Sequence, residues 1–267
     1  MKQIIVLILL AILPLHEVRA QYNTNRLIIS GQSALYYEDY VLSIQYFNQA
    51  LAAKPYLYEP WFYRGLAKFY LDDYTGSEAD VTRAIELNPY IYNMFELRGL
   101  CRIRQKHYAQ AIDDYTRSIN LNPQNQTAWY NRALCRVEDK DYAQAQLDLD
   151  TVVTRWQSYA SAYSLKAQVY LLQTDTLTAD KWLDKCLKVA PYDVDAWNMR
   201  GMIALSRAEW KNADTYLSKV IHLKPKNAAN YVNRALARYN INNLRGAMAD
   251  YDTALDFDPN NFLAHYN

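Results

Sequence analysis

The chain has 267 residues, of which 51% are apolar and 21% charged, so its composition excludes a largely disordered protein. Only 6 glycines and 8 prolines occur, which favours long helices over many tight turns. The formal net charge of +1 shows no basic excess of the kind that a nucleic-acid binder or a polybasic membrane clamp needs.

Residues 1–20 have the composition of a secretory signal peptide. Lys2 supplies the positive start, residues 4–13 are all apolar, and Val18 and Ala20 are the small residues of a cleavage site. The apolar run is too short for a membrane span, which needs about 20 residues. We therefore expect cleavage after Ala20 and an exported protein, periplasmic or extracellular. Cleavage would remove two of the 29 basic and one of the 28 acidic residues, which leaves a net charge of zero.

A period of 34 residues runs through the rest of the chain, in seven units that cover residues 24–261. We number these repeats one to seven and the positions in each from 1 to 34. Six repeats carry a proline at position 32, and repeat four has Gln157 there. The prolines are Pro55, Pro89, Pro123, Pro191, Pro225 and Pro259.

Two columns of each repeat contain only small residues, which predicts that two helices cross closely there. Position 8 holds Gly31, Gly65, Gly99, Ala133, Ala167, Gly201 and Ala235. Position 20 holds Ser43, Ser77, Ala111, Ala145, Ala179, Ala213 and Ala247. Position 4 is large and apolar throughout, as in Trp61, Phe95 and Trp129. Asp39, Asp73 and Asp141 precede the second helical stretch of their repeats and are suited to cap it.

These columns resemble the tetratricopeptide repeat family, whose pattern has an aromatic at position 4, small residues at 8, 20 and 27, and Pro at 32. The resemblance covers residues 24–261. It implies an all-α fold, a right-handed superhelical solenoid of antiparallel helix pairs. Residues 262–267 match the opening of repeat four, so we expect them to begin a truncated eighth repeat in a fragment of a longer protein.

Charged residues also recur with the period. Position 7 holds Arg64, Arg98, Arg132, Lys166, Arg200 and Arg234, and position 23 holds Asp80, Asp114, Asp148 and Asp250 in repeats two, three, four and seven. The matched columns favour structural ion pairs over an anion-binding row of arginines. Trp182 and Tyr216 replace the aspartate in repeats five and six, so Lys166 and Arg200 are the expected free cations.

Signals for chemistry are weak. Three cysteines, Cys101, Cys135 and Cys186, occupy columns of small or apolar residues and are expected to be buried thiols rather than disulfides. The histidines have no metal-ligand spacing, and no phosphate-loop, nucleophile-elbow or zinc-protease motif occurs. We expect no catalytic residue, no metal, no cofactor and no enzymatic activity.

In the family, the first helices of the repeats line a concave groove, and the resemblance places eight residues of this chain on that face. These candidate groove residues are Tyr36, Phe62, Tyr70, Glu96, Arg104, Tyr130, Asn131 and Asn198. Tyrosine and arginine are enriched at binding hot spots, so the expected partner is a protein or peptide. The lysines and asparagines that bind chaperone C-termini in one branch of the family are absent from positions 5 and 9.

Three functions remain open. The first is an extracytoplasmic scaffold or adaptor that binds other proteins of the cell envelope, with no nucleic acid and no membrane span in the mature chain. The second is the sensor domain of a longer membrane receptor, and the third is an accessory array of a longer enzyme. The partner's identity and the oligomeric state do not follow from the sequence.

Overall fold

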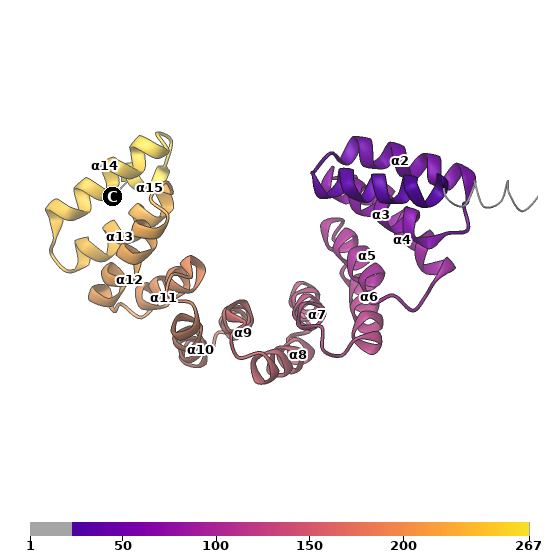
Figure 1. Cartoon of the computed structure of the whole chain (residues 1–267). Helices are drawn as coiled ribbons and strands as arrows, with labels where there is room; N and C mark the ends of the chain where they lie inside the picture. The colour runs from indigo at the N-terminus through magenta and orange to yellow at the C-terminus, as the bar shows by residue number, and fades with distance from the viewer. Residues whose placement is uncertain (1–22, 267) are drawn as a thin grey trace, which may run out of the picture. The chain divides into compact units, whose positions relative to one another are not determined.

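The computed structural model describes residues 23–266, and every regular element in them is a helix (Figure 1). The predicted signal peptide, residues 1–20, lies outside the described part. None of the described helices is both long and apolar enough to cross a bilayer. The predicted all-α architecture of stacked helix pairs is confirmed.

The first helices of the pairs begin 34 residues apart. The described part of the earliest one covers residues 23–36. The others are α3 (Tyr58–Tyr70), α5 (Tyr92–Arg104), α7 (Gln126–Glu138), α9 (Ala160–Leu172), α11 (Val194–Ser206), α13 (Ala228–Asn240) and α15 (Phe262–Tyr266). The last, α15, occupies the predicted start of an eighth repeat, which stays a prediction.

The second helices keep the same interval of 34 residues between their starts. They are α2 (Tyr40–Ala53), α4 (Tyr74–Leu87), α6 (Tyr108–Leu121), α8 (Tyr142–Arg155), α10 (Thr176–Val189), α12 (Trp210–Leu223) and α14 (Leu244–Phe257). Prolines at position 32 follow six of these helices closely, because proline cannot continue a helix.

The turn inside each pair has one residue in the left-handed backbone region, with φ between 57° and 64°. None of the seven is glycine: they are Glu38, Asp72, Lys106, Lys140, Thr174, Ala208 and Asn242. The next residue immediately precedes the second helix. The predicted caps Asp39 and Asp73 accept hydrogen bonds from the backbone N–H groups of Leu42 and Gly76, at 3.1 and 2.9 Å.

The small residues at position 8 are the closest approach of the two helices, as predicted. A Cβ atom placed on Gly99 would lie 2.9 Å from the ring of Tyr115, and one on Gly201 would lie 2.8 Å from Leu217. Tyr115 and Leu217 both stand at position 24, and both are fully buried. Position 24 therefore fills the space that the missing side chain leaves.

Hydrogen bonds from aromatic residues at position 4 link several of the repeats to the repeat before. The indole N–H groups of Trp61, Trp129 and Trp197 donate to the carbonyl oxygens of the position-32 prolines, at 2.9, 3.1 and 2.9 Å. In the repeat without that proline, the hydroxyl of Tyr163 donates to the carbonyl of Gln157 at 3.0 Å. The link therefore depends on a backbone carbonyl, and Gln157 supplies it as well as proline does.

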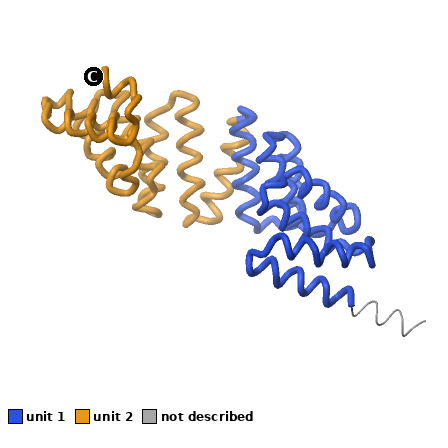
Figure 2. Tube along the Cα trace, turned by 90° about the horizontal axis from the view of Figure 1, so that it is seen from above, with its two compact units in different colours: residues 1–141 blue, residues 142–267 orange. Residues whose placement is uncertain are grey.

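The helices divide into two compact units, one that reaches to Asp141 and one that starts at Tyr142 (Figure 2). The division falls between α7 and α8. Each unit has its own buried clusters, such as the one around Val81, Phe95 and Cys101 in the first unit and the one around Leu183 and Cys186 in the second.

Candidate functional site

The predicted groove residues of the earliest helices are tyrosines that face solvent. Tyr36 is 81% exposed and lies edge-on to Tyr37, which is 76% exposed. Tyr70 is 54% exposed and stacks on Tyr40 with ring centroids 5.0 Å apart. Phe62, by contrast, is partly buried against the hydrophobic cluster of α3 to α5. This end of the first unit thus presents several aromatic rings to solvent.

The next predicted residues differ in their availability. Arg104 ends α5 with an exposed side chain, whereas Tyr130 and Asn131 on α7 are half-buried. Glu96 is also half-buried and accepts a hydrogen bond from the side chain of Asn125. Burial raises the pKa of Glu96, and the bond from Asn125 offsets part of that rise. Of these residues, Arg104 is the most open to a partner.

Seven of the eight predicted residues belong to the first compact unit, and Asn198, half-buried on α11, belongs to the second. None of them lines either of the two pockets described below. The role of the predicted groove residues in binding stays a prediction.

The predicted ion pairs form in repeats two, three and seven, each with a second cation that sequence reasoning missed. In repeat three, Asp114 binds Arg98 at 2.7 Å and Arg102 at 2.8 Å. Asp80 likewise binds Arg64 at 2.6 Å and Lys68 at 2.8 Å. The Asp114 side chain is only 2% exposed, so the two cations replace the water that a carboxylate requires.

The expectation that Lys166 and Arg200 are free cations is wrong. Both have carboxylate partners in the preceding repeat: Lys166 pairs with Asp150, and Arg200 lies 3.8 Å from Asp184. Both aspartates stand at position 25, which faces position 7 of the next repeat. Position 25 is neutral in repeats one, two, three and six, as in Asn48, whose side chain lies 2.6 Å from Arg64, and it is again an aspartate, Asp252, in repeat seven.

In repeats five and six the cation at position 7 therefore still has a negative partner, but at a different position. The carboxylate leaves position 23, and an aspartate appears at position 25 one repeat earlier. The vacated position takes an aromatic ring that packs against the same cation. The ammonium group of Lys166 lies 4.2 Å from the ring centre of Trp182, and the guanidinium of Arg200 lies 5.2 Å from that of Tyr216.

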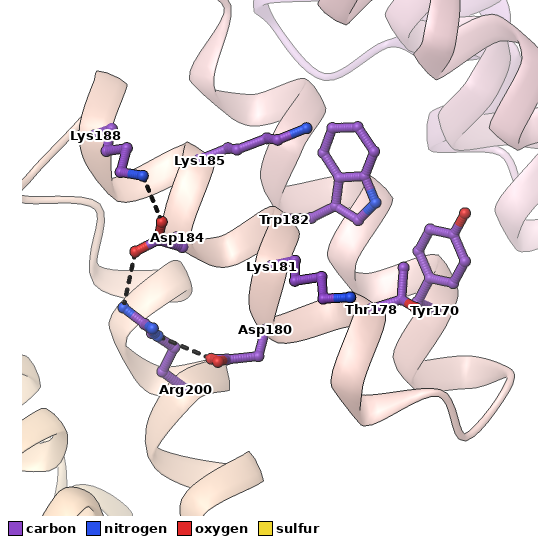
Figure 3. A pocket seen from close by; sticks show the side chains of 9 residues that line it. All are labelled: Tyr170, Thr178, Asp180, Lys181, Trp182, Asp184, Lys185, Lys188 and Arg200. Carbon is purple, nitrogen blue, oxygen red and sulfur yellow. Dashed lines mark hydrogen bonds and ion pairs between the residues drawn. The ribbon is translucent and has the colours of Figure 1, made fainter.

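An open pocket of about 630 Å³ lies in the second unit among α9, α10 and α11 (Figure 3). Its size is within the usual range for ligand sites. Nine residues line it: Tyr170, Thr178, Asp180, Lys181, Trp182, Asp184, Lys185, Lys188 and Arg200. The pocket lies mainly in repeat five. There Tyr170 replaces the cation that other repeats have at position 11, and Trp182 replaces the aspartate that they have at position 23.

The charges of this pocket are arranged on two sides of α10, as Figure 3 shows. On one side Asp180 and Asp184 face Arg200, which donates to Asp180 at 2.9 Å. Asp184 also pairs with Lys188 at 2.7 Å, and this hydrogen bond lowers the pKa of Asp184. On the other side, Lys181 and Lys185 lie near Trp182 and Tyr170.

Sequence reasoning did not find this pocket, although two signals for it are present. Position 11 is basic in repeats two, three, four and seven but holds Tyr170 and Ala204 in repeats five and six. Lys181 and Lys185 are four residues apart, which places them on one helix face. Together these signals indicate a positively charged face of α10 beside positions where the recurring ion pair is missing.

A second pocket and the three cysteines lie outside this site. A second pocket of about 140 Å³, lined by Ile103, Tyr108, Leu134, Cys135 and Glu138, is too small for a typical ligand. The three cysteines are buried and free, as predicted, and burial raises their thiol pKa values to about 11 for Cys101 and about 12 for Cys135 and Cys186. Within residues 23–266, no group of three acidic, histidine or cysteine side chains is placed to hold a metal.

Comparisons with known proteins agree with the helix pairs. The tetratricopeptide repeat model matches residues 98–148 and, in a second version, residues 160–193. A tetratricopeptide repeat protein from Parabacteroides merdae is 17% identical, with a TM-score of 0.71 over 92% of this chain and 97% of the other.

Two further solved structures have similar scores. The C-terminal part of a repeat-containing protein from Cytophaga hutchinsonii is 18% identical, with a TM-score of 0.72 over 90% of this chain and 98% of the other. PilF from Pseudomonas aeruginosa is 13% identical, with a TM-score of 0.66 over 82% of this chain and 98% of the other. A search of curated proteins finds no match. At these identities the similarity establishes the fold alone.

Proposed function

Since the chain is built of tetratricopeptide repeats, we propose that it is a non-catalytic scaffold that binds other proteins through a preformed surface. The observation that carries the proposal is the exposed aromatic surface of the first unit. Tyr36, Tyr37 and Tyr70 keep more than half of their surface in contact with solvent. Aromatic side chains exposed side by side are typical of protein-binding surfaces.

The mechanism is binding without a chemical step. Helix pairs hold the side chains of the first helices in fixed positions, so a partner orders little of this protein when it binds. Tyr70 is held by its stack on Tyr40, and Arg104 lies at the end of the rigid helix α5. The tyrosine rings supply contact area, and Arg104 supplies a charged hydrogen-bond donor.

We place this scaffold outside the cytoplasm, in the cell envelope. The support is the order of charge, apolar run and small residues in residues 1–20. Intact-mass measurement of the protein from its native cells tests this: a mature form that starts at Gln21 is expected. A full-length form found only in the cytoplasm would contradict export without affecting the scaffold proposal.

Partner capture tests the scaffold. The immobilised chain is incubated with envelope extract beside a Tyr130→Ala, Arg104→Ala variant, and retained proteins are identified and then purified. Direct titration of a purified partner should show saturable binding that weakens at least about tenfold in the variant, as for removal of two hot-spot residues. Equal binding by both forms would show that Tyr130 and Arg104 are not part of the binding surface.

A further inference from the structure

The pocket at α10 has more positive charge than its own carboxylates balance. Four cations line it, Lys181, Lys185, Lys188 and Arg200, against the two carboxylates of Asp180 and Asp184. Both carboxylates are already engaged, with Arg200 and Lys188. Lys181 and Lys185 therefore provide two positive charges that no side chain of the pocket neutralises.

This arrangement works against the stability of α10, which suggests another use for it. Like charges four residues apart on a helix face repel one another. Lys181 and Lys185 form such a pair on α10, whereas Lys188 lies on the other side of the helix and pairs with Asp184. Lys181 has the carboxylate of Asp175 within electrostatic reach, at the start of α10. An anionic ligand that lies between the ammonium groups of Lys181 and Lys185 removes the repulsion between them.

The pocket also holds one of its cations in place before any ligand arrives. The ammonium group of Lys185 lies 3.9 Å from the ring centre of Trp182. The indole packs beside the buried side chain of Leu183 and contacts Tyr163 at 6.1 Å between ring centres, which fixes its orientation. A lysine that is already positioned loses less conformational entropy on binding an anion.

The ring geometry favours a peptide over a nucleic acid. A nucleotide base would stack on the face of Trp182, but the ammonium groups of Lys166 and Lys185 lie 4.2 and 3.9 Å from the ring centre. Glutamate or aspartate side chains need only the two lysines, and an apolar side chain between them could contact the edge of the indole or Tyr170. The net charge near zero also gives no long-range attraction for phosphate backbones.

We propose that this pocket binds an acidic peptide segment of a protein partner, with two carboxylates on Lys181 and Lys185 and an apolar side chain against Trp182 and Tyr170. The proposal rests on the scaffold function but names a second surface, formed mainly by the second helix α10 rather than by the predicted groove residues. The pocket thus specifies an acidic partner segment, which the groove residues do not specify.

Fluorescence anisotropy of a labelled probe peptide tests the proposal. The probe has four glutamates around one leucine, and its matched control has four glutamines around the same leucine. Both are titrated with the full chain at low and moderate salt. We expect the glutamate peptide to bind at least about tenfold more tightly, with an affinity that falls as salt rises.

Two charge-matched variants locate the site. Lys181→Gln with Lys185→Gln should weaken binding of the glutamate peptide about tenfold, as expected for the loss of two charge pairs. Lys219→Gln with Lys226→Gln removes the same charge from exposed positions of the next repeat, Lys219 being the equivalent of Lys185. This control should change the affinity less than about twofold.

Several outcomes would overturn the proposal. They are equal binding of the two peptides, equal effects of the two double variants, or competition by single-stranded oligothymidylate at the concentration where the peptide itself competes. The Tyr130→Ala, Arg104→Ala variant should bind the peptide as the unaltered chain does. If this variant binds the peptide normally but partner capture fails, the predicted groove is wrong and the pocket proposal is retained. If partner capture succeeds but the peptide does not bind at the pocket, only the pocket proposal is wrong.

Discussion

Repeat three holds a buried Asp114 between Arg98 and Arg102, whereas repeat five has Trp182 at the same position and pairs its cation, Lys166, with Asp150 of the repeat before. In repeat three the carboxylate is buried and its cations are partly exposed. In repeat five the cation is buried, with 2% of its surface exposed, and the carboxylate is 56% exposed. The same helix seam therefore tolerates either sign of charge, provided that a counter-charge lies within reach.

The largest effect should come from removing the cation of each region. Arg98→Met leaves the buried Asp114 with one partner and should destabilise the chain by about 3 kcal/mol, the cost of an incompletely paired buried charge. Lys166→Met leaves Asp150 in water and replaces a buried ammonium with an apolar group, so a change below about 1 kcal/mol is expected. Urea unfolding followed by circular dichroism measures both, and equal losses would remove the distinction between the regions.

Filling the small column should also separate the regions. Gly99→Ala puts a methyl group against the ring of Tyr115, which is fully buried and cannot move, so a loss of about 1–3 kcal/mol is expected. Gly201→Ala meets the Cδ2 and Cγ atoms of Leu217 at 2.8 and 2.9 Å. This side chain is equally buried but more flexible than an aromatic ring, so a smaller loss is expected, because the gain in helix propensity of about 1 kcal/mol offsets part of the crowding. Thermal unfolding of the two variants would contradict this if Gly201→Ala were the more damaging.

The turns differ in the strain of their left-handed residue. Thr174 has φ 64°, which is unfavourable for a β-branched residue, whereas Asp72 at 60° belongs to a type that tolerates this region. Thr174→Gly should therefore stabilise the chain by about 1 kcal/mol, and Asp72→Gly by less. Asp72 also accepts a hydrogen bond from Tyr74, which glycine would lose. Chemical denaturation midpoints compare the two, and a stabilisation by Asp72→Gly as large as that by Thr174→Gly would contradict the strain argument.

The smallest effect concerns a carboxyl group at position 5 that is present in repeat three and absent from repeat six, where Asn198 stands. Because burial raises the pKa of Glu96 in the folded chain, its contribution to stability is complete below the unfolded pKa of about 4.3 and is lost as the pH rises through the folded value. Glu96→Gln should match the unaltered chain near pH 4 and become slightly more stable by pH 7. A variant that is less stable at pH 7 would show that the ionised carboxylate is favourable there.

The period and the small columns made the fold predictable, because helix pairing repeats with the sequence. The Arg98–Asp114 pair was predictable for the same reason, since both columns lie within one repeat. Lys166 and Arg200 were misjudged because their partners, Asp150 and Asp184, stand at position 25 of the repeat before rather than at position 23 of the same repeat. The left-handed turns carried no signal, since none of their residues is glycine. The pocket depends on the side chains at positions 11 and 23 of repeat five together. A comparison of one column at a time does not reveal it.

The bonds from Trp61, Trp129 and Trp197 to the carbonyl of the repeat before each of them have a practical consequence. Each indole sits at a different junction, and each loses its carbonyl acceptor to water when that junction opens. Single-tryptophan versions of the chain, with phenylalanine at the other five indole positions, would report the fraying of one junction at a time through a red shift in emission. The chain can thus reveal the order in which its repeats come apart, without an added label.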